Sequence, residues 1–324
     1  MPACHARRVC RRVPPPGVIE ALSMERVDVD DGSGMVRRNG ATSGHGAPIG
    51  IGKRSAARAH RGHILALSAS AGGVSIALAP MPDTLGITEC WSEPPQHAAS
   101  DRLLANADAL LRSQRLAPAD LALIAVDIGP GPFTAIRAAC AMAQGLALGR
   151  ALPIVAASST EILAMQAAME LGVGRHTVMV VIDARMDEWY CATLEVVLDA
   201  AAAVQSVAEL RPCVVCAAQA VWAQAGPPAA PSPSTLLAIA GDGSSRLFGP
   251  GAPLDQLARE QGWLPVIATH ARTVRADALA ALVRSEWFQA MASGRTEASP
   301  RYVRNKVALD VDEQRAARAG GGAR

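Results

Sequence analysis

The sequence predicts a duplicated α/β fold, and three features support this prediction. Two segments, 64–78 and 178–194, each show two short apolar runs around a tight turn, the pattern of a β-hairpin. Each hairpin is followed by alternating strand-like and helix-like runs. A continuous apolar run at 121–126 leads through a glycine–proline turn into a long helical segment. Two halves that open and continue alike indicate two similar lobes, each a sheet with helices on its faces.

In the first half, apolar runs and turn residues predict a hairpin, two further strands and two helices. The expected strands are 64–68, 74–78, 121–128 and 151–156, and the helices begin near 100 and 134. Ser100 is expected to cap the first of these helices. Ser158 and Glu161, three residues apart, are expected to form a capping box for the helix that follows.

The second half repeats the pattern with another hairpin, a further strand and two helices. The expected strands are 178–183, 189–194 and 236–240, and the expected helices are 253–261 and 275–291. Cys213 and Cys216 form a C-x-x-C motif inside an apolar run, without a second pair or nearby histidines. We interpret them as two small buried residues of a strand rather than as a zinc site.

Composition narrows the class of protein. Half of the 324 residues are apolar, yet no apolar run reaches the length that a membrane span needs. Seven scattered cysteines, an odd number, favour a reducing cytoplasm. Five Trp, three Phe and two Tyr are too few for an obvious base-stacking platform. We therefore expect a cytoplasmic protein that does not read nucleic-acid bases by itself.

The net charge of +2 conceals an asymmetry. Residues 1–62 hold eleven Lys and Arg against five Asp and Glu, whereas the remainder holds twenty against twenty-four. The mildly acidic remainder has the wrong sign to neutralise many phosphates. Residues 1–62, rich in Arg, Gly, Pro and Ser, are expected to be disordered. The favoured interpretation is that translation starts further along the chain, and the second is a basic flexible tail. A transit peptide is disfavoured, because such peptides contain few acidic residues.

A stiff elbow follows the long apolar run. Gly129, Pro130, Gly131 and Pro132 combine glycine freedom with two fixed φ angles, and Thr134 is expected to cap the next helix. A nucleotide-binding loop is one interpretation, since a glycine loop before a helix N-terminus suits an anion. A structural elbow is favoured, because the prolines lack N–H donors and no Lys-Ser or Lys-Thr pair follows.

Several of these motifs occur together in one order along the chain. They are the opening hairpin from Ile64 and the segments 129–137, 143–149, 153–163, 183–188, 241–243 and 300–307. This combination resembles the TsaB (YeaZ) family, the small bacterial subunit of the machinery that makes threonylcarbamoyladenosine in tRNA. The resemblance covers about residues 63–307.

The resemblance implies an actin-like ATPase-domain (ribonuclease H-like) duplicated fold with two similar α/β lobes. The expected division is a disordered basic extension at 1–62, a first lobe at 63–157, a second lobe at 158–307 and a flexible tail at 308–324.

The resemblance also implies a non-catalytic scaffold that activates a larger, metal-binding TsaD-like subunit by heterodimerisation. That subunit transfers the threonylcarbamoyl group to the adenosine next to the anticodon, and a small TsaE-like ATPase joins the assembly. tRNA is expected to be bound indirectly, through the complex. This chain is expected to bind no cofactor, with ATP and a metal on the partner subunits, and to form a homodimer when alone.

The residues of the first hairpin agree with a silent ATP site. An actin-like ATPase needs a carboxylate there to hold metal-bound water near the phosphates. The family usually has Asp-Thr-Ser, and this chain has Ser68, Ala69 and Ser70. His97 is a lone histidine, where a metal site would need a pair. The alternative is an autonomous ATP-dependent small-molecule kinase of the same fold; a protease ranks last, since no Ser-His or Cys-His arrangement is evident.

The resemblance places the partner interface on two helices of the first lobe. The expected interface residues are Leu103, Leu104, Ala107, Leu111, Phe133, Ile136, Arg137 and Cys140. The expected elbow and hairpin motif residues are Gly129, Pro130, Gly131, Thr134, Asp183 and Arg185, and no catalytic or metal-binding residue is expected.

Three of these residues carry open alternatives. Arg137 is either a partner-facing ion pair or an internal tether of the elbow. Asp183 and Arg185 either shape their turn through a side-chain hydrogen bond, which is favoured, or contact the cleft between the lobes. Leu104→Asp and Ile136→Asp are each expected to abolish pairing with the partner subunit while leaving the fold largely intact.

Overall fold

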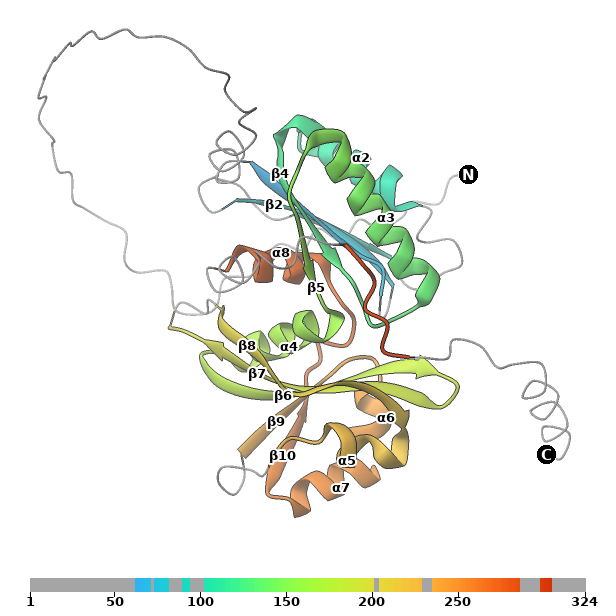
Figure 1. The fold of residues 1–324 in the computed structure, drawn as a ribbon. Helices are drawn as coiled ribbons and strands as arrows, with labels where there is room; N and C mark the ends of the chain where they lie inside the picture. The colour runs from blue at the N-terminus through green and yellow to red at the C-terminus, as the bar shows by residue number, and fades with distance from the viewer. Residues whose placement is uncertain are drawn as a thin grey trace, which may run out of the picture.

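The computed structural model describes residues 62–70, 73–81, 89–93, 102–200, 204–228, 235–285 and 298–304 (Figure 1). Ser100, His97, residues 1–61 and the tail at 308–324 lie outside these ranges, and so do the expectations made for them. The described residues form two lobes, each built on its own sheet.

The first sheet has five strands in the order β3-β2-β1-β4-β5. The strands are β1 His63–Ser68, β2 Val74–Pro80, β3 Glu89–Glu93, β4 Leu121–Asp127 and β5 Ile154–Ala157. β1 pairs antiparallel with β2 and parallel with β4. The predicted first hairpin and the two strands that follow it are confirmed, and β3 adds an edge strand that the sequence pattern did not indicate.

The second sheet has the order β10-β9-β6-β7-β8. The strands are β6 Gly174–Arg185, β7 Glu188–Leu198, β8 Val204–Ala217, β9 Thr235–Ala240 and β10 Trp263–Ile267. The predicted second hairpin and the strand near 236–240 are confirmed. Only the end of β8, around Cys213 and Cys216, was predicted as a strand. The rest was not, because most of its first ten residues are exposed and do not alternate between apolar and polar.

The two sheets share one topology. In each, the first strand of the lobe pairs antiparallel with the second and parallel with the fourth, which in turn pairs parallel with the fifth. Parallel neighbours need a crossover connection, which in this fold carries helices. The repeated order confirms the predicted duplicated α/β architecture with two similar lobes.

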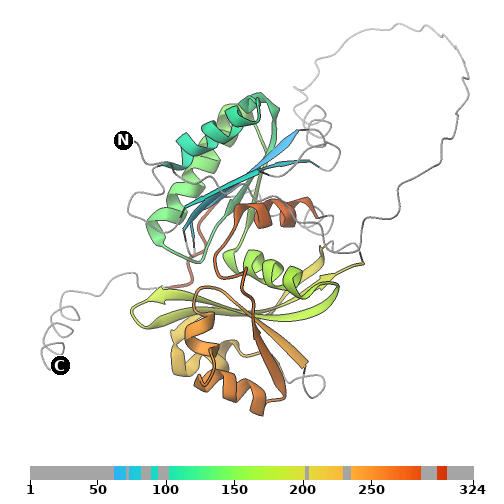
Figure 2. The ribbon, with the colours of Figure 1, turned by 180° about the vertical axis from the view of Figure 1, so that it is seen from behind.

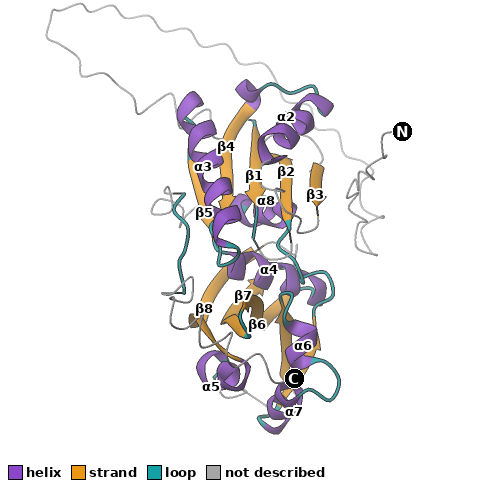
Figure 3. Cartoon of the chain, turned by 90° about the vertical axis from the view of Figure 1, so that its right-hand side faces the viewer, coloured by secondary structure: helices purple, strands orange, loops and turns teal. Residues whose placement is uncertain are grey.

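Helices cover the outer faces and fill the space between the sheets. The helices are α2 Leu103–Ser113, α3 Phe133–Arg150, α4 Ser159–Leu171, α5 Val221–Ala225, α6 Ser244–Phe248, α7 Pro253–Glu260 and α8 Ala276–Arg284, with short 3₁₀ turns at Pro118–Asp120 and Ala218–Ala220. Figure 3 shows α2 and α3 in front of the first sheet, away from the second lobe.

The two helices between the sheets each pack on the opposite lobe. α4 follows β5 of the first lobe but packs on β6 and β7, whereas α8 follows β10 of the second lobe but packs on β1 and β2. Both views from front and back show them as a middle layer (Figures 1 and 2). Ala276 donates its backbone N–H to Ser75 Oγ at 3.1 Å, which fixes the start of α8 on the first sheet.

Apolar burial forms three clusters. The central core joins the facing sides of both sheets to α4 and α8, the first outer core joins α2 and α3 to the first sheet, and the second outer core lies under α5 and α7. Because the central core includes residues of both lobes, the lobes are held as one body at their middle layer.

Local signals placed some helix starts correctly and missed others. Ser158 accepts a hydrogen bond from the Glu161 N–H, and the Glu161 carboxylate accepts from the Ser158 N–H, so the predicted capping box is confirmed. The expectation for Thr134 was wrong. α3 already begins at Phe133, after Pro132, and no side chain caps it. Cys213 and Cys216 lie in β8, as predicted, with Cys216 buried and Cys213 half-buried.

We expect Gly241→Ala to lower the free energy of unfolding by roughly 3 kcal/mol, since it combines backbone strain with steric overlap. Gly241 has a φ of +96°, and an added Cβ would lie 2.0 Å from the carbonyl oxygen of Val181. Gly149→Ala is the matched control, because its Cβ would meet nothing within 4 Å and the site is helical. Urea unfolding measures both; equal stabilities would contradict the prediction.

Candidate functional site

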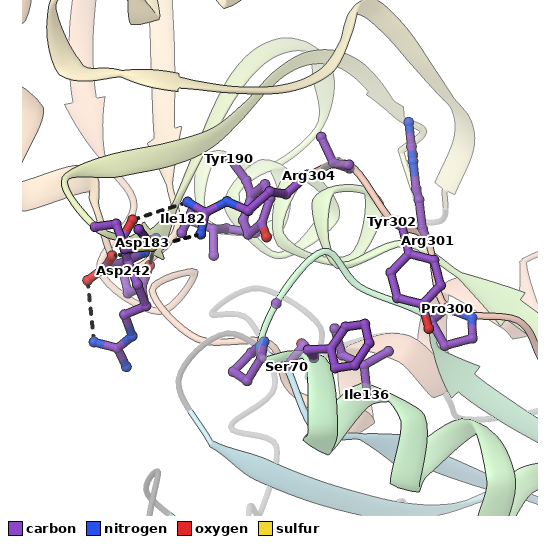
Figure 4. Close-up of a pocket in the computed structure, with 17 residues that line it drawn as sticks. Ser70, Ile136, Ile182, Asp183, Tyr190, Asp242, Pro300, Arg301, Tyr302 and Arg304 are labelled. Carbon is purple, nitrogen blue, oxygen red and sulfur yellow. Dashed lines mark hydrogen bonds and ion pairs between the residues drawn. The ribbon is translucent and has the colours of Figure 1, made fainter. Parts of the chain in front are cut away.

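A cavity of about 330 Å³ opens between the two lobes (Figure 4). Three segments supply most of its lining: the elbow with the start of α3, the β6–β7 hairpin near its tip, and residues 298–304, which we call the strap; Ser70 and Asp242 complete it. The lining residues are Ser70, Gly131, Pro132, Phe133, Ile136, Ile182, Asp183, Ala184, Arg185, Met186, Tyr190, Asp242, Pro300, Arg301, Tyr302, Val303 and Arg304. The elbow, hairpin and strap motifs of the sequence therefore converge on one place.

The hairpin tip is shaped by side-chain hydrogen bonds. Asp183 Oδ1 accepts from the Arg185 N–H at 2.7 Å, and the Asp183 N–H donates to Asp242 Oδ1 at 2.8 Å. Arg185, Met186 and Asp187 all have positive φ angles, between 56° and 65°. The favoured interpretation of Asp183 and Arg185 as turn-shaping residues is confirmed, and the alternative also holds, since both line the cavity.

The charges around this cavity are largely paired within the protein. Arg301 lies 3.0 Å from Glu209, Arg304 forms an ion pair with Glu188, and Arg185 lies 3.6 Å from Asp183. Burial raises the pKa of Asp242, while its hydrogen bond from the Asp183 N–H opposes this. A phosphate or another anion entering the cavity would have to compete with these carboxylates for each guanidinium.

The elbow makes the contact between the first lobe and α4. Gly129 has a φ of +94° and precedes a cis bond to Pro130. Its N–H donates to Asp127 Oδ1 at 2.9 Å, and its carbonyl accepts from the Ser159 N–H at 2.8 Å. With Gly129 N–H engaged and two prolines without donors, the structure agrees with the structural interpretation of this elbow.

Beneath the elbow lies a fully buried carboxylate that the sequence reasoning missed. Asp127, the last residue of β4, accepts hydrogen bonds from Ser68 Oγ at 2.8 Å, from Ser159 Oγ at 2.8 Å and from Ser70 Oγ, besides the one from Gly129. The available signal was a single acid that closes an apolar run directly before the elbow. Its three serine partners could not be named, because they lie 32 to 59 residues away.

Asp127 stands near the position where the family's hairpin carboxylate is replaced by Ser68. Burial raises its pKa, and the four hydrogen bonds lower it again in part. Both carboxylate oxygens are occupied by internal donors, so the group faces no open space in which it could hold a metal-bound water. Within the described ranges, no three His, Cys, Asp or Glu side chains cluster as a metal site would require.

The structure sorts the expected interface residues into two groups. Five lie in the first outer core and pack on their own lobe: Leu103, Ala107, Leu111, Ile136 and Cys140, each at most 5% exposed. A buried side chain is not available to a partner, so the expectation is corrected for these five. Leu104, Phe133 and Arg137 are exposed and remain candidates.

Arg137 is an internal tether, although its partner is the strap rather than the elbow. Its Nε donates to the Tyr302 hydroxyl at 2.7 Å, and its guanidinium lies 3.9 Å from the centre of the Phe133 ring. The rings of Phe133 and Tyr302 lie 5.4 Å apart. Thr134, beside them on α3, is exposed.

We expect Asp127→Ala to lower the free energy of unfolding by about 3 kcal/mol, because it leaves buried donors without an acceptor. Asp127→Asn is the matched control, since it keeps the shape and one carbonyl oxygen for the Gly129 N–H, and it should cost less. Urea unfolding at neutral pH compares the two. An alanine variant as stable as the asparagine variant would show that the hydrogen bonds contribute little.

The stability contribution of Asp127 should decrease as the pH rises. Burial holds its folded pKa above the ordinary value of 3.8, so the folded state binds the proton more tightly than the unfolded state. Between these two pKa values the unfolded chain is already ionised while the folded one is not, and the free energy of unfolding falls with pH. The free energies of unfolding of the wild type and of Asp127→Asn are measured across this pH range. As the pH rises, the wild type should lose stability relative to the asparagine variant; a relative gain would contradict the prediction.

Comparisons with known proteins agree with this geometry. Residues 94–221 match the family model described as TsaD, tRNA N6-adenosine threonylcarbamoyltransferase. The chain is 35% identical over 127 residues to the tRNA threonylcarbamoyladenosine biosynthesis protein TsaB of Haemophilus influenzae, a match that covers 39% of this chain and 51% of that protein. It is 37% identical over 93 residues to the Escherichia coli protein of the same name, covering 29% and 39%. The match thus spans about half of the length of the first curated relative and less of the second.

Solved structures extend the likeness over the whole fold. A Pseudomonas aeruginosa protein described as uncharacterized with similarity to peptidase YEAZ superposes with a TM-score of 0.56 at 27% identity, covering 75% of this chain and 100% of that one. YeaZ from the same organism gives 0.55 at 27% identity, covering 74% and 99%. No helix in the described part of the chain is long and apolar enough to cross a membrane. In sequence over part of its length, and in its two-lobed fold, the chain is therefore similar to TsaB (YeaZ) proteins.

Proposed function

We propose that this protein is a non-catalytic subunit of the assembly that makes threonylcarbamoyladenosine in tRNA, and that it activates a TsaD-like catalytic subunit by pairing with it. The names of its curated TsaB relatives support the pathway. The match of residues 94–221 to the TsaD model supports a shared ancestry with the proposed partner.

The observation that carries the non-catalytic role is the buried state of Asp127. Asp127, which accepts hydrogen bonds from Ser68 and Ser70 of the first hairpin, has four internal donors in all and is fully enclosed. The guanidiniums of Arg301 and Arg304 are paired with Glu209 and Glu188. Phosphoryl transfer needs carboxylates and cations that can reach the phosphates and a metal ion. These groups are committed to the structure of the protein itself.

The exposed side of α2 and α3 supports the pairing. Leu104 is 58% exposed and Leu148 is 87% exposed, so two leucines face solvent on the first lobe. Between Arg137 and Leu148, α3 presents Ala141 and Gly145, and an added Cβ at Gly145 would meet nothing within 4 Å. Small residues flanked by exposed leucines allow a partner helix to approach closely and bury apolar surface.

The remaining parts of the proposal concern the assembly. A TsaE-like ATPase joins the pair, ATP and a metal belong to the partner subunits, and tRNA is held by the complex as a whole. Alone, this chain pairs with itself through the same helices. The complex works in the cytoplasm, where the tRNA is.

Size-exclusion chromatography with light scattering tests the proposal on the full chain, alone and mixed with the TsaD-like protein of the same organism. A homodimer that converts to a one-to-one heterodimer supports it. If the mixture shows no species with the mass of a heterodimer, the proposal is overturned. Titration calorimetry with Mg-ATP then tests the alternative function. Saturable binding of Mg-ATP by the isolated chain would favour an autonomous kinase over a non-catalytic subunit.

Leu104→Asp should abolish the heterodimer while the fold is retained, because it places a charge on the exposed face of α2. Val173→Asp is the matched control, since Val173 is also 58% exposed but lies in the second lobe. Ile136→Asp tests the corrected assignment: Ile136 is only 3% exposed, so the variant should lose stability rather than pairing alone. Light scattering and thermal melts measure both; a heterodimer that survives Leu104→Asp would exclude this face.

A further inference from the structure

The strap runs from the first lobe to the second (Figure 1), and its residues 300–304 line one side of the cavity (Figure 4). It belongs to neither sheet and has no helical or strand structure of its own. Its residues contact α3 and Ile128 in the first lobe, and β8 and the second hairpin in the second lobe. It therefore touches both sides of the cavity along a short stretch of chain.

On the first lobe the strap has three anchors. Gln144 Nε2 of α3 donates to the Ala298 carbonyl at 3.1 Å, and the Arg301 N–H donates to the Ile128 carbonyl at 2.8 Å. Tyr302 accepts the hydrogen bond from Arg137 and packs against the Phe133 ring. Ala298 itself is 1% exposed, inside the first outer core.

On the second lobe the strap is held by two arginines. Arg301 donates to Glu209 Oε1 of β8 at 3.0 Å. Arg304 donates to the Arg185 carbonyl at 3.2 Å and forms an ion pair with Glu188 at the start of β7. The Arg304 side chain is only 12% exposed, so it is packed as well as paired. Arg304 thus supports the hairpin tip with its three positive φ angles.

The strap is the main polar connection across this side of the molecule. Within the described ranges, no hydrogen bond or ion pair joins elbow residues 129–132 directly to the hairpin tip at 185–187. Other polar contacts between the lobes lie in the middle layer, where the Gln166 side chain of α4 forms hydrogen bonds with the segment before α8. Rotation about that middle layer would widen the cavity and stretch the strap.

We propose that the strap is a clasp that holds the two lobes closed over the cavity, with Arg304 as its hook on the second lobe. Its first-lobe end is fastened by backbone and aromatic contacts, which a substitution at Arg304 leaves in place. Its second-lobe end depends on charged side chains from one segment. Loss of Arg304 should therefore release the hairpin tip while the sheets and the middle layer stay intact.

Hydrogen–deuterium exchange of the full chain, followed by mass spectrometry, tests the clasp with Arg304→Gln. The matched control is Arg175→Gln, which removes an exposed ion pair with Glu195 that lies wholly within the second lobe. In Arg304→Gln, amides of the hairpin tip should exchange about tenfold faster, whereas the Arg301 amide, which donates to the Ile128 carbonyl on the first lobe, should keep its wild-type rate. Amides of β4 and β6 should keep their wild-type rates, and Arg175→Gln should leave the strap unchanged.

Two outcomes overturn the proposal. Wild-type exchange at the hairpin tip in Arg304→Gln would mean that Arg304 does not hold the second lobe to the strap. Faster exchange spread evenly through both sheets would mean that Arg304 supports the fold as a whole. Tyr302→Phe gives a second, milder variant: it removes only the hydroxyl that Arg137 bonds, and it should speed exchange at the strap more than at the hairpin tip. The clasp concerns this chain alone, so its failure would leave the pairing experiment unaffected.

Discussion

The enclosed carboxylate of Asp127 is the interaction on which the junction of the two lobes depends. A buried acid is tolerated only where donors surround it. Here the donors come from the first hairpin, the elbow and the start of α4, and each has to lie at hydrogen-bond distance at the same time. The hairpin turn, the bend after β4 and the entry into the middle layer are therefore positioned relative to one another by a single group.

From this junction the architecture extends in two directions. α4 leaves toward the second sheet, and α8 returns to the first, so the central core is shared between the lobes. α3 leaves on the other side and covers the outer face of the first sheet, with its far side exposed. The same elbow thus orients both the helix that joins the lobes and the helix proposed to meet a partner.

The cavity between the lobes is built from groups that satisfy one another. Its arginines are paired with acids of the second sheet, and its elbow contributes prolines where a phosphate site would offer amides. In this fold the cleft between lobes is a natural place for a ligand. Paired charges along it favour a role in holding the lobes in one arrangement, which suits the proposed supporting role.

The sequence by itself determined the features that depend on near neighbours. Alternating and continuous apolar runs predicted both hairpins and the strands beside them, and the spacing of Ser158 and Glu161 predicted their capping box. Only the tertiary structure decided which helix faces are buried. Ile136 and Cys140 were placed on the partner interface, yet they face the first sheet, because periodicity marks an apolar side without saying what covers it.

Tertiary structure alone also decided the long-range pairs. Arg137 meets Tyr302 across 165 residues and Arg304 meets Glu188 across 116. Such contacts have no local signature, since helix and strand signals act over three or four residues. They form because the repeated topology brings the ends of the first strands of both lobes to one edge, where the strap crosses. The sequence therefore determined the elements and the order of the two lobes, and the packing of those lobes decided which of its polar residues work together.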